Sequence, residues 1–148
     1  MKKAICVSFV ILLIFLSFAS CGIGKLTIED HEWKMAAVMI NDMELADSDS
    51  IVIAVGEPDE VHPNAPVVDI ILTAKDGQLT VTDMTNDKVY KGTYKVTQIT
   101  PRGTDYKIEL DGQSGYATVA PTKYYGGEEV PTLPINLGGR SLYFIPND

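Results

Sequence analysis

The chain carries few side chains of the kinds that bind metals, and their spacing fits no metal site. Its two histidines, His31 and His62, are too few for a zinc site without carboxylate ligands, and the interval between them matches no zinc motif. The acidic triplet Asp-Ser-Asp at 47–49 begins like a calcium loop, but Ile51 stands where a third oxygen ligand belongs and Val52 where glycine is required. We therefore expect surface histidines, a solvated acidic turn, and no metal or other cofactor.

Two further patterns contain a serine or paired glutamates, the residue types that hydrolases use, but the neighbouring residues do not fit a hydrolase site. Ser114 lies between Gly112 and Gly115, but the second glycine comes one residue too early for a nucleophile elbow, and no helix pattern follows. This stretch predicts a hairpin. Glu128 and Glu129 are adjacent in a glycine-rich stretch, so their carboxylates point apart and do not form an acid–base pair. With no phosphate loop, dinucleotide fingerprint or Cys-x-x-Cys motif, the sequence predicts a protein that is not an enzyme.

Cys21 is the residue with the clearest predicted chemistry. Two lysines at positions 2 and 3 precede an apolar run over 4–19, and small residues come directly before Cys21. A basic start, a short apolar segment and small residues at the cut form an export signal. The ending Phe-Ala-Ser-Cys at 18–21 resembles the lipobox of bacterial lipoproteins, which implies cleavage after residue 20 and a diacylglyceryl thioether on the Cys21 sulfur. We therefore predict a signal peptide over 1–20 and a lipidated cysteine with a tether over 21–30.

Ordinary secretion and an uncleaved membrane anchor are the alternatives to a lipoprotein. The apolar run has about 16 residues, fewer than the roughly 20 that cross a hydrocarbon core of ~30 Å. A diacylated Cys21 would hold the domain firmly on the extracytoplasmic face of the membrane, because one acyl chain binds only marginally and two bind stably. Cys6 would leave with the signal peptide, so the mature fold would have no disulfide.

The charge balance limits the partners of the mature domain. Removing residues 1–20 leaves 12 − 2 = 10 basic residues against 20 acidic ones, a formal charge of 10 − 20 = −10. This balance argues against nucleic acid, whose backbone requires clustered Lys and Arg. It also repels anionic headgroups, so the lipid rather than the protein surface would hold the domain at the membrane. The remaining 148 − 20 = 128 residues suit one domain with one core.

Hydrophobic patterning predicts about nine short strands and no long helix. Turn signals separate the apolar runs at the 8–12-residue spacing typical of sandwiches and barrels. The strongest turn signal is Asp76-Gly77, because this pair permits the positive φ of a tight hairpin. The expected strands lie at 32–40, 51–55, 67–74, 79–82, 89–96, 106–110, 116–120, 132–137 and 141–145. In the first of them, Trp33, Met35, Ala37 and Met39 are expected to share one face.

Consecutive tight hairpins favour an all-β fold, an antiparallel up-and-down β-barrel over 31–148. Residues 25–30 are either tether or a first short strand. Tyr90, Tyr94, Val96 and Tyr106 lie on the expected inward face, where they either fill the core or line a ligand cavity. Tyr124 and Tyr125 flank a Gly-Gly pair, which suggests an exposed contact surface for a protein or glycan.

The tryptophan at the start of the first long strand, Trp33, and the Gly-Thr-Tyr run at 92–94 in an exported β meander resemble the lipocalin-like lipoproteins of bacteria. The resemblance spans roughly 32–145. It implies that Trp33 plugs the closed end of a barrel whose open end takes a small apolar ligand. The expected function is thus a membrane-tethered, extracytoplasmic, non-catalytic barrel that binds a small ligand at the cell envelope. The alternative is a solid barrel that acts as a protein-interaction or inhibitor module through its loops, chiefly 57–66 and 124–131.

Overall fold

The computed structural model describes residues 25–40, 51–57, 60–123 and 127–147, and every regular element among them is a β-strand. The strands are β1 (Trp33–Ile40), β2 (Ile51–Val55), β3 (Ile70–Lys75), β4 (Gln78–Asp83), β5 (Lys88–Thr100), β6 (Gly103–Leu110), β7 (Gln113–Lys123), β8 (Glu129–Leu137) and β9 (Arg140–Pro146). The predicted all-β class and strand number are confirmed. The described residues form no helix long and apolar enough to cross a membrane.

Several sequence predictions lie outside the described residues. These are the signal peptide over 1–20, the lipid site Cys21, the acidic triplet at 47–49, and the contact residues Tyr124 and Tyr125.

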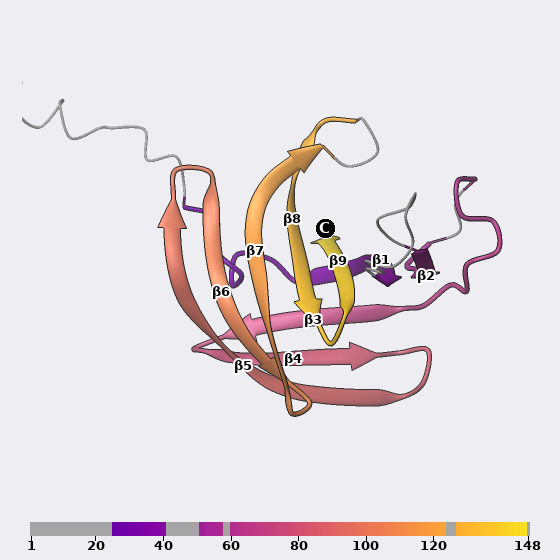
Figure 1. Cartoon of the computed structure of the whole chain (residues 1–148), viewed down its shortest axis with the longest axis horizontal. Coiled ribbons are helices and arrows are strands. Elements are labelled where there is room, and N and C mark those ends of the chain that lie inside the picture. The colour runs from indigo at the N-terminus through magenta and orange to yellow at the C-terminus, as the bar shows by residue number, and fades with distance from the viewer. Residues whose placement is uncertain (1–24, 41–50, 58–59, 124–126, 148) are drawn as a thin grey trace, which may run out of the picture.

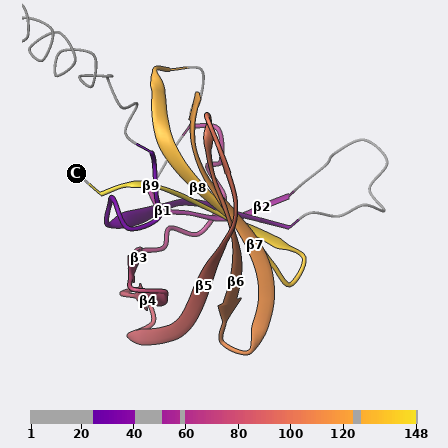
Figure 2. The ribbon, with the colours of Figure 1, turned by 90° about the vertical axis from the view of Figure 1, so that its left-hand side faces the viewer.

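Eight strands close into an antiparallel barrel. β1 is followed around the ring by β3, β4, β5, β6, β7, β8 and β9, and β9 returns to pair with β1 (Figure 1). β2 lies outside this ring. It pairs with the C-terminal half of β1, whereas β3 pairs with Trp33 and Lys34 at the start of β1. Figure 2 shows β2 running out beside the end of β1. The predicted up-and-down order therefore holds for eight strands, and the remaining strand, β2, is added at one edge of β1.

Local turn chemistry sets two of the hairpins. Asp76 and Gly77, between β3 and β4, have φ angles of 50° and 79°, and Asp111 and Gly112, between β6 and β7, have 49° and 74°. Positive φ at both central residues gives the twist that the flanking strands require. The stretch that contains Ser114 is thus a hairpin that leads into β7, as predicted.

Large side chains fill the interior of the barrel. The largest fully buried ones are Trp33, Tyr106, Phe144, Ile28, Leu72, Leu79, Ile108, Leu133 and Ile135. An eight-stranded ring has an interior just wide enough for side chains to fill, so removal of this apolar surface from water stabilises the closed form.

An irregularity in β1 changes which side chains face the core. The register of β1 against β9 shifts between Met35 and Ala37. Trp33 and Met35 belong to the core, and beyond the shift Val38 does so, while Ala37 and Met39 line a groove outside it. The prediction of one shared face is therefore wrong beyond Met35, because one extra residue reverses the alternation of a strand.

Candidate functional site

Residues 26–30 close one end of the barrel. The Ile28 side chain is fully buried; its N–H donates to the Tyr106 hydroxyl (3.0 Å), and its carbonyl accepts from Nε1 of Trp33 (2.8 Å). The Thr104 hydroxyl donates to the Leu26 carbonyl (2.9 Å). Figure 1 shows this segment beside β6. The chain that the sequence assigns to a tether is thus part of the packing of the barrel from Leu26 onward, and we call residues 26–30 the plug.

A tight turn shapes the plug locally. The Asp30 carboxylate accepts from the Thr27 N–H (2.6 Å), and the Asp30 N–H donates to the Thr27 carbonyl (3.2 Å). An aspartate that bonds nearby backbone in this way favours a turn over a strand. Of the two alternatives for residues 25–30, the strand is therefore wrong, because Leu26 and Ile28 enter the barrel from a turn.

The four predicted ligand-binding residues share a face, but they have different surroundings. Tyr106 is 1% exposed and belongs to the core, whereas Val96, its partner on β5, is 44% exposed. Tyr94 meets Tyr106 edge-on, with ring centroids 5.7 Å apart and an interplanar angle of 76°. Tyr90 is partly buried against the core. None of the main hollows formed by the described residues is lined by any of the four.

The hydroxyls of Tyr94 and Tyr106 hold the plug. Tyr94 donates to the Glu29 carboxylate, which also accepts from the Asp76 N–H (3.1 Å). Partial burial, and then the hydrogen bond to Glu29, raise the pKa of Tyr94 to about 12. Burial also raises the pKa of Tyr106. Both hydroxyls stay protonated at neutral pH, which suits a structural donor or acceptor and not a general base.

The two histidines have separate surroundings. The His31 ring lies edge-on to Trp33, with centroids 5.2 Å apart, and His62 borders an outer groove. In the part of the chain that the structure describes, no three His, Cys, Asp or Glu side chains are placed to share a metal ion.

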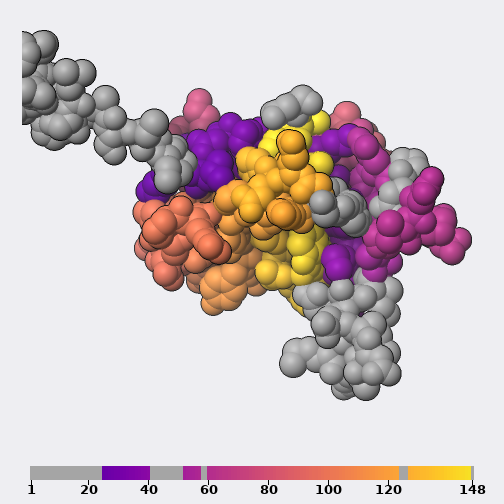
Figure 3. All heavy atoms as spheres, turned by 90° about the horizontal axis from the view of Figure 1, so that it is seen from above, coloured from indigo at the N-terminus to yellow at the C-terminus, as the bar shows by residue number. Residues whose placement is uncertain are grey.

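That groove is the most apolar of the main hollows that lie beside the predicted loops, and it has a volume of about 370 Å³. Its apolar walls are Ala37, Met39, Val52, Pro134 and Tyr143, from β1, β2, β8 and β9. Figure 3 shows the orange ends of β7 and β8 to the left of the magenta loop that follows β2. The structure thus presents its candidate site on the outside of the barrel.

One of the loops singled out from the sequence lines this groove, together with strand residues on either side of the other predicted loop. His62, from the loop at 57–66, lines it, as do Thr122 and Lys123 just before the loop at 124–131 and Thr132 just after it. His62 and these three residues lie far apart in sequence, and closure of the ring through β1 and β9 brings them together. The sequence marked both regions but gave no sign that His62 and the residues around 122–132 border one groove.

Contacts with β1 position the first loop. The Gly56 N–H donates to the Ala36 carbonyl (3.0 Å), and a Cβ at Gly56 would lie 1.7 Å from the Met35 carbonyl oxygen. Only glycine therefore fits here. Lys34 forms an ion pair with the exposed Glu57 carboxylate, which lowers the pKa of Glu57.

β2 borders the groove and has one edge that is largely without a strand partner. Beyond its pairing with β1, the Val55 N–H donates to the Pro66 carbonyl (2.9 Å) and the Val55 carbonyl accepts from the Val68 N–H (2.7 Å). Among the described residues, β2 makes no other outward backbone bond. Such an edge offers donors and acceptors to which an extended peptide can pair.

An apolar hollow, an edge strand and the loop that carries His62 therefore lie together on the outer face, whereas the barrel interior is occupied by core side chains. Comparison of the chain with known protein families, with characterised proteins and with solved structures gives no match.

Proposed function

We propose that this protein is an extracytoplasmic lipoprotein, tethered to a membrane of the cell envelope through Cys21, whose barrel is a non-catalytic module that binds an extended segment of a partner protein. The export-signal pattern and the small residues before Cys21 support the tether. The observation that carries the binding role is the apolar groove of about 370 Å³ that Val52 of β2 borders.

The groove and the edge suit an extended segment for complementary reasons. Backbone groups of β2 supply hydrogen bonds independent of sequence, and the hollow between Met39, Val52 and Tyr143 receives side chains that project from one face of the added strand. Main-chain pairing then gives affinity, and the shape of the hollow gives specificity. The filled barrel interior favours this role over a ligand held inside the ring.

A small apolar ligand is the second candidate, in keeping with the resemblance to lipocalin-like lipoproteins. The groove volume of about 370 Å³ lies within the range of roughly 300–1,000 Å³ usual for small-molecule sites. The same walls would hold either occupant, so the test must identify what binds.

A photocrosslinking residue at Tyr143, introduced into the protein in its own host, tests the groove. Tyr116, which is 66% exposed on β7 and outside the groove, is the matched control position. We expect one discrete polypeptide adduct from position 143 and none from 116. A small-molecule mass on the protein in native mass spectrometry, without a polypeptide adduct, would instead establish the second candidate. If neither kind of adduct is found with the residue at position 143, the groove is not the binding site.

The tether has its own test. Intact mass should show the diacylglyceryl group on the wild-type protein, and Cys21→Ser should move the protein from the membrane fraction to the soluble fraction. If the variant still sediments with membranes, the lipid anchor is wrong.

A further inference from the structure

At the plugged end, β5 extends beyond its neighbour β4 and continues as a hairpin with β6, which is itself paired with β7. β5 has 13 residues, and its pairing with β4 ends at Thr93, opposite Gln78. From Lys95 onward, β5 pairs with β6 alone until the turn at Thr100 and Gly103. Figure 1 shows the tip of this hairpin close to the start of the indigo segment, which begins at Lys25. We call residues 95–104 the overhang.

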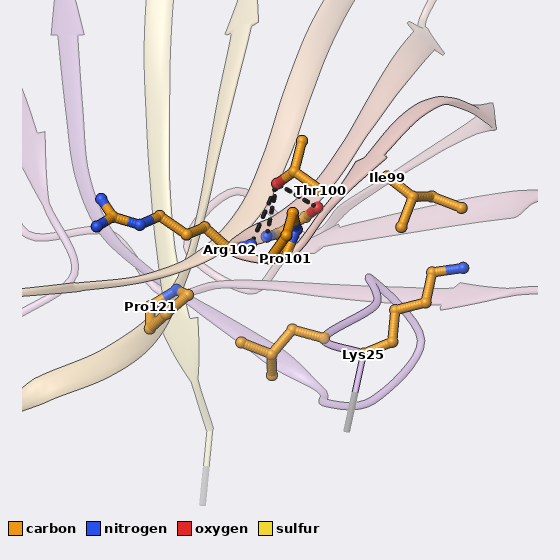
Figure 4. Close-up of a pocket in the computed structure, with 8 residues that line it drawn as sticks. Lys25, Ile99, Thr100, Pro101, Arg102 and Pro121 are labelled. Carbon is orange, nitrogen blue, oxygen red and sulfur yellow. Dashed lines mark hydrogen bonds between the residues drawn. The ribbon is translucent and has the colours of Figure 1, made fainter. Parts of the chain in front are cut away.

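The overhang exposes apolar side chains on β5, where β4 no longer pairs with it. Val96 is 44% exposed and Ile99 is 51% exposed. Ile99 and Pro101 form one side of a hollow of about 500 Å³, and Leu26 and Pro121 form the rest of its apolar wall (Figure 4). Exposed apolar residues gathered in this way mark a contact surface more often than an ordinary solvated face.

Two cations border the same hollow. Lys25 and Arg102 are exposed, and neither forms an ion pair with another described residue. Figure 4 shows their charged ends directed outward on opposite sides of the apolar residues. Among the described residues, no acidic side chain lines the hollow, although the chain as a whole is acidic. An apolar centre flanked by cations is the composition of surfaces that lie at the boundary between headgroups and acyl chains.

Two backbone N–H groups at the tip of the overhang are bonded internally. The Thr100 hydroxyl accepts from the N–H groups of Arg102 (3.2 Å) and Gly103 (3.1 Å), and it lies 3.1 Å from the Gly103 carbonyl (Figure 4). The backbone at Pro101 has no N–H to satisfy. A tip of this kind can leave water at low cost, since unsatisfied backbone groups are what make entry into lipid unfavourable.

The covalent chain restricts how far this surface can lie from the predicted anchor. Three residues separate Cys21 from Lys25, so their Cα atoms lie at most about 14 Å apart, at roughly 3.6 Å per residue. With its lipid in the bilayer, Cys21 therefore holds Lys25 and the adjoining hollow close to the headgroups. We propose that the overhang, together with Lys25, Leu26 and Pro121, contacts the surface of the bilayer that holds the Cys21 lipid and orients the barrel with its plugged end toward the membrane. This inference rests on the proposed lipid anchor.

Single-cysteine labelling tests the orientation. Cys21 would be blocked by its lipid and Cys6 removed, so a new cysteine is the one thiol available for a fluorophore. The test position is Ile99→Cys and the matched control is Val89→Cys, which is 60% exposed near the other end of β5, about 33 Å away by strand rise. The lipidated proteins are reconstituted into vesicles of phosphatidylcholine and phosphatidylglycerol that carry a shallow nitroxide quencher.

We expect several-fold stronger quenching at position 99 than at position 89. Lys25→Glu combined with Arg102→Glu should reduce the quenching at 99 while the lipid mass and cosedimentation with vesicles persist. If lipidated, vesicle-bound protein shows equal quenching at both positions, the orientation is refuted and the anchor stands. If intact mass shows no lipid on Cys21, the anchor itself fails, and this inference fails with it.

Discussion

Replacement of Ile28 by alanine distinguishes a plug from a flexible tether. Ile28 has no exposed surface, and its backbone bonds to Tyr106 and Trp33 do not depend on its side chain. The substitution therefore removes buried carbons and leaves a cavity, for which losses of about 2–5 kcal/mol are usual. We expect the free energy of unfolding to fall by about 3 kcal/mol, a large part of the roughly 5–15 kcal/mol that stabilises a domain.

Urea unfolding of residues 21–148 with Cys21→Ser measures this loss. The chain has one tryptophan, and its indole bonds to the Ile28 carbonyl, so fluorescence reports on both the plug and the core. With an m-value of about 1.5–2 kcal/mol/M, a loss of about 3 kcal/mol lowers the midpoint by about 1.5–2 M. The control is Val67→Ala, at a residue 48% exposed, where we expect a change within about 0.5 kcal/mol.

A loss from Ile28→Ala as small as that from Val67→Ala would refute the plug. Residues 26–30 would then be a tether in solution, and the buried hydrogen bonds of Trp33 and Tyr106 would need other partners.

Three further substitutions test the packing of the barrel. Tyr106→Phe leaves the buried Ile28 N–H without its acceptor and should cost about 1–3 kcal/mol in urea unfolding, whereas an unchanged midpoint would contradict that bond. Because the pKa of Tyr94 is raised to about 12 in the folded state and is about 10 unfolded, its protonated form stabilises the fold fully below pH 10. That stability should be lost as the pH rises from 10 toward 12, and Tyr94→Phe should remove this part of the pH dependence of the urea midpoint. Gly92→Ala places a Cβ 2.1 Å from a carbonyl oxygen of β6, so its Tm should fall below that of Gly112→Ala, where the Cβ meets nothing within 4 Å and the cost is limited to alanine at a φ of 74°. Equal values would argue against the close approach of β5 and β6.

The strands could be predicted because their causes are local. Alternation between apolar and polar side chains or a β-branched run marks each one, and Asp76-Gly77 sets its hairpin through backbone conformation alone. The position of β2 outside the ring could not be predicted in this way. Its β-branched run looks like any other strand, and what excludes it is the pairing of β3 with the start of β1, a contact between distant segments.

The plug shows the same limit at the candidate site. Leu26 and Ile28 gave a weak apolar alternation before Trp33, which was the available signal. Their partners Thr104 and Tyr106 each lie 78 residues further along the chain, so only the folded ring reveals the bonds. Alternation did place Tyr94 and Tyr106 on one face correctly. Whether that face lines a cavity depends on how Trp33 and other large side chains fill the interior, which a one-dimensional pattern does not specify.

Because β1 and β9 pair, the strands could follow one another in a different order along the chain and still keep their places in the ring. Asn147 donates from its N–H to the Glu32 carbonyl (2.9 Å) and from Nδ2 to the Glu32 carboxylate (2.6 Å), so the beginning and the end of the barrel are held side by side. A short linker from Asn147 to Leu26 would permit a circular permutant that opens at Asp111-Gly112, an exposed turn, with every β-ladder intact. In such a permutant, a lipid anchor placed at the new N-terminus would invert the barrel relative to the membrane.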